Sequence, residues 1–305
     1  MDMTGKTVAT PTKAEAPGRR LVGIALMCGA LICFAGLDSS AKWAGRSVDP
    51  LVTTWARYTF SVVIVSFVLN PITTPGLTRT RRPWLQIGRS LLLLVSTSLN
   101  FLALQHLQLT QTVSIQFAAP LIIALLGGPL LGERIGARRL AAVIVGFLGV
   151  LVITRPGLGG VHPAALYSVA GAVCYALYNI STRFLAAHDS SATTLFYSGL
   201  AGVVVMTPIL PFVWTTPPDL LTWVLLAATG MFGAVGHWLL ILAHARAPAG
   251  VLAPFIYTQL LWMLAAGYLI FGDVPDRWTL VGAAIVIASG LYLLYRERGP
   301  RTKAI

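Results

Sequence analysis

Three ionisable residues, Asp38, Lys42 and Arg57, lie within stretches of sequence that are otherwise strongly apolar. Asp38 and Lys42 are four residues apart, so on a helix their side chains share a face and could form an ion pair. Arg57 lies at a depth similar to that of Asp38, about 9 Å from the start of the next apolar stretch. Because charged groups are costly in an apolar environment, the three residues predict a charged gate or a group that responds to a proton or a substrate. The alternative is a structural ion pair at the edge of the apolar region, with Lys42 extended toward water.

A second group of polar and aromatic residues lies in apolar stretches nearer the C-terminus. His237 lies deep inside such a stretch, and a histidine side chain can change its charge between about pH 5 and 8. Tyr257 and Gln259 follow Pro254, and Trp262 lies about one helical turn further on. A helix loosened by proline beside such side chains is typical of a cavity wall. The alternative for each residue is packing or hydrogen bonding between helices.

The remaining polar residues of interest come from several apolar stretches. Ser98 and Gln116 belong to a polar stripe on two neighbouring stretches, and Asn179 lies in a later one. Pro120 frees a backbone carbonyl, which could contact a ligand or only bend the helix. Arg89 lies near the start of its stretch, so we expect its side chain to snorkel to the membrane surface.

The composition requires a membrane around these residues. Of 305 residues, 56% are hydrophobic and 10% are charged, and the mean hydropathy is +0.77. A soluble domain carries about 25% charged residues, so the chain is predicted to be an all-α membrane protein. Since about 20 helical residues cross a bilayer, we expect ten transmembrane helices. These are 21–44, 51–69, 84–104, 110–131, 139–154, 164–185, 193–213, 220–243, 250–271 and 278–295.

The basic residues predict the orientation in the membrane. With the N-terminus in the cytoplasm, 16 Lys and Arg residues fall in cytoplasmic segments and 3 in outer loops. Cytoplasmic loops of membrane proteins carry an excess of Lys and Arg, so we expect both termini in the cytoplasm and the chain in the inner membrane. Residues 1–20 and 296–305 would be cytoplasmic tails. The net charge of +12 then reflects contact with anionic lipid rather than with nucleic acid.

The chain also repeats itself at an offset of about 140 residues. Pro71 matches Pro211, and Gly132-Glu133 matches Gly272-Asp273. Each unit contains five expected spans, an odd number, so the second unit would be inverted relative to the first. Inverted repeats are typical of alternating-access transporters, which bind their substrate near the membrane midplane.

The repeated segments resemble the EamA-type repeat of the drug/metabolite transporter superfamily. The residues that carry this resemblance are Pro120, Gly132-Glu133-Arg134, Gly146 and Gly149, and then Pro254, Tyr257, Gly267, Gly272-Asp273, Gly282 and Gly290. The resemblance implies two such repeats, at 21–154 and 163–295. It also implies that the first four helices of each repeat surround a central cavity, whereas the fifth and tenth lie peripherally. Members of the family export amino acids and related metabolites or take up compounds such as riboflavin and S-adenosylmethionine, and the Asp38-x-x-x-Lys42 pattern is similar to the uptake branches.

We therefore expect a secondary-active transporter of a small polar metabolite, with an exporter of drugs or toxic metabolites as the alternative. An intramembrane enzyme is disfavoured because the spans contain no catalytic Ser–Lys, paired Asp or His-Glu-x-x-His arrangement. No cofactor or metal is expected, and a proton or other coupling ion and a second copy of the chain are candidate partners. Because span 250–271 contains no basic residue, a phosphorylated substrate is disfavoured. The candidate substrate-pathway residues are Asp38, Arg57, Ser98, Gln116, Pro120, Asn179, His237, Tyr257, Gln259 and Trp262.

Overall fold

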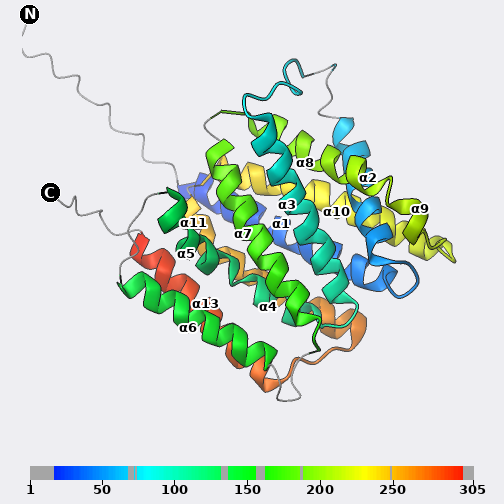
Figure 1. Cartoon of the computed structure of the whole chain (residues 1–305). Coiled ribbons are helices and arrows are strands. Elements are labelled where there is room, and N and C mark those ends of the chain that lie inside the picture. Colours follow the sequence, from blue (N-terminus) through cyan, green and yellow to red (C-terminus); the bar gives the residue numbers. More distant parts are fainter. Residues whose placement is uncertain are drawn as a thin grey trace, which may run out of the picture.

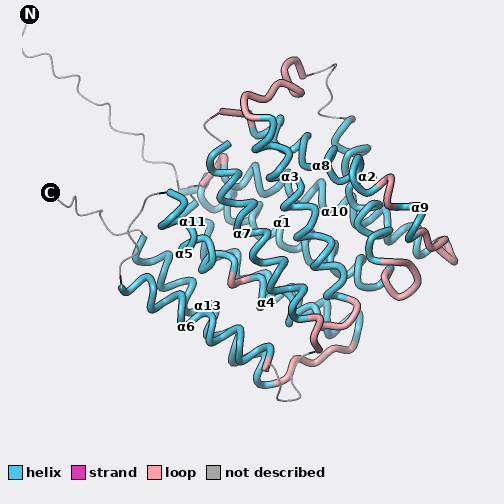
Figure 2. The backbone as a smooth tube through the Cα atoms, viewed as in Figure 1, coloured by secondary structure: helices cyan, strands magenta, loops and turns pink. Residues whose placement is uncertain are grey.

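The computed structural model describes residues 17–67, 72, 74–131, 137–155, 162–185, 188–247 and 249–297. Throughout these ranges the regular structure is helical and contains no β-strand, as Figure 2 shows. This confirms the all-α class for the described part of the chain. The repeat residues Gly132 and Glu133 lie outside it. The longest elements are α1 (Pro17–Ala44), α2 (Pro50–Ser66), α3 (Pro83–Leu104), α6 (Ala137–Thr154), α7 (Ala165–Leu185), α8 (Ser191–Met206), α10 (Leu220–His244) and α13 (Arg277–Glu297).

Several helices begin at residues that favour a helix start. Proline occupies the first turn of α2 and of α3, where its missing N–H is not needed. Asp49 accepts a hydrogen bond from the Leu51 amide, and Asp219 accepts one from the Thr222 amide at 2.7 Å. These side chains satisfy amide groups that the first turn of a helix leaves without a partner.

Two of the expected spans are interrupted rather than continuous. The fourth consists of α4 (Leu109–Gln116) and α5 (Ala119–Leu131). The ninth consists of α11 (Ala249–Leu252), the 3-10 helix η1 (Ala253–Thr258), α12 (Gln259–Ala266) and the short π-helix η2 (Gly267–Phe271). Pro120 and Pro254 lie at these interruptions. Proline lacks the amide hydrogen that a continuous helix needs, so it favours a break in the helix. The seventh span is likewise divided into α8 and the short α9 (Leu210–Val213).

The helices and their surface suit a lipid environment. Within the described residues three helices are long and apolar enough to cross a membrane, namely Arg19–Ala44, Pro83–Leu104 and Leu220–His244, and five shorter apolar helices accompany them. Many large apolar side chains are exposed, including those of Leu166, Val204 and Leu269. A water-soluble monomer rarely exposes apolar surface on this scale, whereas lipid tails favour it.

Helices from the two halves of the chain pack in pairs. α1 packs along α10, α3 along α7, and α6 along α13. Figure 1 shows α6 and α13 side by side at one edge of the molecule. Their backbones approach closely at Gly149 and Gly282, where a Cβ added to either glycine would lie 3.0 or 2.6 Å from the carbonyl oxygen of the other. Only glycine permits such an approach, so these residues fix where the two helices meet.

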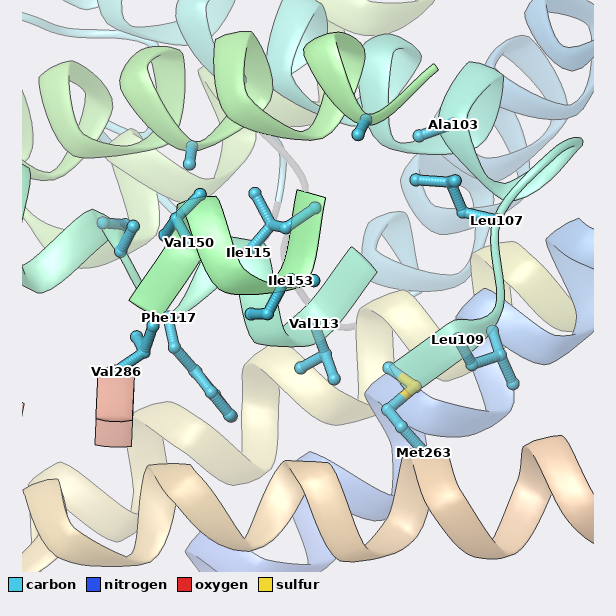
Figure 3. Close-up of a cluster of buried hydrophobic side chains, with 14 of the residues drawn as sticks. Ala103, Leu107, Leu109, Val113, Ile115, Phe117, Val150, Ile153, Met263 and Val286 are labelled. Carbon is cyan, nitrogen blue, oxygen red and sulfur yellow. The ribbon is translucent and has the colours of Figure 1, made fainter. Parts of the chain in front are cut away.

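The main apolar core surrounds the interruption between α4 and α5. Ile115, Phe117, Ile153, Met263 and Val286 belong to it and come from α4, the α4–α5 junction, α6, α12 and α13. Figure 3 shows these side chains gathered around the short helix α4. The core therefore holds the interrupted helices in place, and it lies apart from the cavity described next.

Candidate functional site

A cavity of about 280 Å³ lies among α2, α3, α7, α8 and α10. Its polar lining includes Arg57 and Tyr58 of α2, Arg89 of α3, Tyr178 of α7 and His237 of α10. The rest of its wall is mostly apolar and includes Val62, Val65, Leu93, Leu195, Leu240 and Ile241. A mostly apolar pocket with a few converging polar groups is the usual form of a small-molecule site.

Arg57 is the charged residue with the least complete set of partners in this cavity. Its side chain is buried, with 9% of the residue exposed, and Nη1 donates a hydrogen bond to the Thr97 hydroxyl at 2.8 Å. The guanidinium carbon lies 4.8 Å from the centre of the Tyr58 ring. Nε is buried and has no hydrogen-bond partner. Because an unsatisfied buried donor is costly, Arg57 is prepared to bind an acceptor group.

Arg89 does not snorkel as the sequence analysis expected, since only 2% of it is exposed. Nε donates to Thr182 at 2.7 Å, Nη1 donates to Ser198 at 2.9 Å, and Nη2 donates to the Tyr178 hydroxyl at 2.9 Å. These acceptors belong to α7 and α8 and lie more than 85 residues away in the sequence. Arg89 therefore anchors α3 to the second half of the chain and forms one wall of the cavity.

The sequence analysis left Arg89 out of the candidate site, although its position contained a signal. Arg89 is six residues from Pro83 at the start of α3, and Arg57 is seven residues from Pro50 at the start of α2. The two arginines are therefore at similar depths in their helices. Tyr58, Thr97 and the acceptors of Arg89 were also missed, because hydroxyl groups in apolar spans most often bond to their own helix.

Asp38 and Lys42 do not form the ion pair that their spacing suggested. The Asp38 carboxylate accepts a hydrogen bond from the Asn100 amide at 3.1 Å. The Lys42 ammonium donates to the Asp273 carboxylate at 2.9 Å and to the Leu107 carbonyl at 3.0 Å. Each charged group thus has a partner from another helix or loop, and these partners replace the pairing within α1.

The position of Asp273 depends on the turn that ends η2. Gly272 has φ +69°, a left-handed conformation that glycine adopts without steric cost. The Asp273 amide donates back to the Gly267 carbonyl at 2.9 Å, which closes the turn. The Lys42 ammonium also lies 4.9 Å from the centre of the Phe271 ring. The two halves of the chain are therefore joined at this end by an ion pair and an aromatic contact.

The cavity extends toward the opposite end of the molecule. Ser66, at the end of α2, and Asp189, between α7 and α8, line it there. Asp189 accepts hydrogen bonds from the Arg81 amide at 3.0 Å and from the Gln86 side chain at 3.1 Å. In Figure 1 the segment that precedes α3 lies at the top, and the segment near residue 270 lies at the bottom. The cavity thus reaches one end, and the Lys42–Asp273 ion pair lies at the other.

The structure brings together some of the residues predicted from the sequence. His237 lines the same cavity as Arg57, and its ring meets the Phe34 ring edge to face at 5.1 Å. Asp38 lies close enough to Arg57 for electrostatic attraction, although the two do not form an ion pair. Arg57, His237 and Asp38 therefore belong to one region.

The other predicted residues lie apart from this cavity. Tyr257 is buried against Phe117, with ring centres 5.0 Å apart, and its hydroxyl has no hydrogen-bond partner. Gln116 is also near the core, with an unpaired side-chain oxygen, and Pro120 lies in the first turn of α5.

Two of the remaining side chains bond within their own helices, and two belong to α12. Asn179 donates to the Tyr175 carbonyl, and Ser98 donates to the Leu94 carbonyl. Gln259 is half-buried at the start of α12, and Trp262 is 37% exposed.

The arrangement is one that binds and orients a ligand. Among the described residues no group of three or more His, Cys, Asp or Glu side chains could hold a metal ion. The cavity instead presents guanidinium, phenol and imidazole groups on an apolar wall, which suits a small organic molecule with acceptor groups.

Comparison with known proteins gives consistent results over nearly the whole chain. The sequence model of the EamA-like transporter family matches residues 21–155 and 162–296. An S-adenosylmethionine uptake transporter from Rickettsia bellii is 30% identical over 285 residues, which cover 93% of this chain and 97% of the relative. A riboflavin transporter from Vibrio cholerae is 28% identical and covers 91% of this chain and 94% of the relative. A solved crystal structure with 17% sequence identity shares the fold, with a TM-score of 0.59 over 92% of this chain and 99% of that chain.

Proposed function

The chain belongs to the EamA-like transporter family, and from that premise we propose that it is a secondary-active transporter of a small polar metabolite. The family match confirms the resemblance drawn from the repeats. It also makes the chain an integral membrane transporter rather than an enzyme. The substrate is a small organic molecule of the kind that the relatives carry, such as S-adenosylmethionine or riboflavin. The observation that carries this proposal is the cavity among helices of both halves, with the incompletely paired Arg57 in its wall.

The proposed topology is ten transmembrane helices in two inverted repeats, residues 21–154 and 163–295. The N-terminal tail, residues 1–20, and the C-terminal tail, 296–305, lie in the cytoplasm, and the chain lies in the inner membrane. Support comes from the two matches to the family model, from the distribution of basic residues and from the pairing of helices between the halves. A reporter fused after Arg298 should be cytoplasmic, and an external readout would contradict this topology.

Transport proceeds by alternating access in this proposal. In the proposed topology Ser66 and Asp189 are on the cytoplasmic side, so the cavity opens inward. The Lys42–Asp273 ion pair is then at the outer end and closes it. The conformation described above is therefore the inward-open one, and separation of this ion pair accompanies opening to the outside.

The substrate pathway in this proposal begins with Arg57, His237 and Asp38 beside the cavity. Arg57 supplies a cation, and Asp38 supplies a neighbouring carboxylate that could couple transport to a proton. The other candidates would line further parts of the pathway as the helices move, namely Ser98, Gln116, Pro120, Asn179, Tyr257, Gln259 and Trp262.

Reconstitution in liposomes tests this function. Purified protein should accumulate labelled S-adenosylmethionine, riboflavin or another metabolite of a screening panel above the level of empty liposomes. An imposed proton gradient should raise accumulation if the coupling ion is a proton. The exporter alternative predicts net movement in the opposite direction in cells. Absence of protein-dependent flux for the whole panel in both directions would contradict the proposal.

A further inference from the structure

We propose that Arg57 and Gly233 form a subsite for a carboxylate group of the transported metabolite. This inference rests on the function proposed above and specifies the chemistry that the cavity recognises. It follows from the unpaired Nε donor of Arg57, from the missing side chain at Gly233 and from the charges around the cavity.

The first observation is the orientation of the Arg57 guanidinium. Nη1 donates to Thr97, and the planar face lies over Tyr58. The edge of the guanidinium that carries Nε makes neither of these contacts, and Nε has no hydrogen-bond partner although it is buried. A guanidinium binds a carboxylate along one edge through two parallel hydrogen bonds. Because Thr97 and Tyr58 hold the group from other sides, this edge is preorganised for such a ligand.

The second observation is the missing side chain beside this edge. Gly233 of α10 lines the cavity, and a Cβ built on it would lie 3.8 Å from the Arg57 Nε and 3.3 Å from the Leu37 side chain. A methyl group at this position would therefore be in van der Waals contact with Nε. Because Gly233 places no side chain against Nε, a ligand at this edge meets less steric hindrance than it would beside an alanine.

The third observation is the balance of charge around the cavity. Arg57 and Arg89 both line it, and neither takes part in the ion pairs of the described residues, Lys42–Asp273 and Arg155–Asp276. The Asp38 carboxylate lies near Arg57 but accepts a hydrogen bond from Asn100, and the Arg57 Nε remains without a partner. Arg89 donates to neutral hydroxyl and carbonyl groups that hold it in the wall. Asp189, at the mouth, already accepts three hydrogen bonds. One guanidinium edge thus remains available, which suits a single carboxylate better than a phosphate with two charges.

Binding experiments on the purified full-length protein test the subsite. The first probe pair is S-adenosylmethionine and its decarboxylated analogue, which differ only in the carboxylate. The second is a panel of small aromatic carboxylic acids, each with its primary amide. We measure the ligand-induced rise in the thermal unfolding midpoint and the concentration that gives half of the rise. The acids should bind about tenfold or more tightly than the matched amides or the decarboxylated compound.

Three variants separate the subsite from general effects on folding. Arg57→Lys keeps the charge but loses the Nε edge, and Gly233→Ala keeps the charge but adds a methyl group beside Nε. Both should remove most of the preference for acids. Gly88→Ala is the matched control, because a Cβ there would meet nothing within 4 Å, and it should bind like the wild type. If Arg57→Lys fails to fold, Gly233→Ala still decides the outcome.

The result that overturns this inference differs from the one that overturns the transport function. If no acid binds more tightly than its amide, or if Gly233→Ala keeps the full preference, the carboxylate subsite is wrong. If Gly233→Ala reduces uptake of riboflavin, which has no carboxylate, as strongly as binding of the acids, the effect is not specific for carboxylates, and the subsite is wrong while transport stays intact. Conversely, selective binding of acids without flux in liposomes would support the subsite and contradict the transport function.

Discussion

Replacement of Asp273 by asparagine should shift the transporter toward outward-open conformations. The substitution keeps the size of the side chain but removes the negative charge that pairs with Lys42 at 2.9 Å. The two side chains are 24% and 15% exposed, so the pair is shielded from much of the solvent. A hydrogen bond between charged groups contributes about 1.5–3 kcal/mol in such settings. A loss of about 2 kcal/mol from the outward-closed state changes the ratio of the two conformations about 30-fold.

Cysteine accessibility measures this shift. Ser61 lines the cavity, and a cysteine placed there reports whether a thiol reagent can enter from outside. The reporter requires a background without the three native cysteines, Cys28, Cys33 and Cys174. A membrane-impermeant reagent added outside intact cells should label the Asp273→Asn variant faster than the unchanged protein. The reversed pair, Lys42→Asp with Asp273→Lys, should restore part of the slow rate.

A second ion pair of the same type provides the control. Arg155, just after α6, pairs with Asp276, just before α13; the pair lies away from the cavity, and the side chains are 25% and 42% exposed. Asp276→Asn should cost at most about 1 kcal/mol, as is usual for exposed pairs, and should leave labelling at Ser61 unchanged. Equal labelling rates in the Asp273→Asn, Asp276→Asn and unchanged proteins would refute the assignment of the Lys42–Asp273 pair as an outer closure.

Three further outcomes are expected. Arg89→Ala should lower the free energy of unfolding by about 2–4 kcal/mol, because several buried acceptors lose a charged donor. The loss should appear as a lower thermal unfolding midpoint in detergent, and a midpoint equal to that of the wild type would contradict the described network. If Asp38 takes part in coupling, Asp38→Asn should reduce uphill, gradient-driven transport much more than substrate exchange at equal concentrations. Equal loss of both transport modes at matched protein levels would show that Asp38 has no role in coupling. Hydrogen bonds from the Thr222 amide and hydroxyl lower the pKa of the Asp219 carboxyl. The ionised carboxylate therefore stabilises the fold at pH values above the ordinary pKa of an aspartate, and this contribution is lost as the pH falls through the lowered pKa. The difference in thermal midpoint between wild type and Asp219→Ala should therefore shrink in acid, whereas a constant difference would contradict this account.

Much of the fold could be predicted because the strongest signals lie close together along the sequence. The third expected span, 84–104, corresponds to α3 within one residue at its start, since Pro83 marks the helix start and the apolar run has the length of a span. The spans that contain Pro120 and Pro254 were predicted as continuous. Proline only indicates that a helix is disturbed, and the packing of other helices decides whether it bends or breaks.

The site was less predictable because its partners come from distant parts of the chain. Spacing suggested that Lys42 pairs with Asp38, whereas its partner is Asp273, which lies 231 residues away. Arg89 was expected to extend to the membrane surface because it lies near a helix end. Its burial depends on Thr182 and Ser198, and no local pattern identifies them as its acceptors. Local periodicity therefore predicts which residues lie in the membrane but not which partners they meet.

The pairing of helices between the two halves has a consequence for synthesis of the chain. α1 ends at Ala44, and its main packing partner, α10, begins at Leu220, so about 175 residues are made between them. At about 5–20 residues per second the ribosome needs roughly 10 to 35 s for this interval. Throughout it the apolar flank of α1 that later contacts α10 must face lipid or the insertion machinery, and Lys42 has no carboxylate at Asp273 to bind. Assembly in the bilayer is thus largely completed after insertion, when the last helices arrive and displace these temporary neighbours.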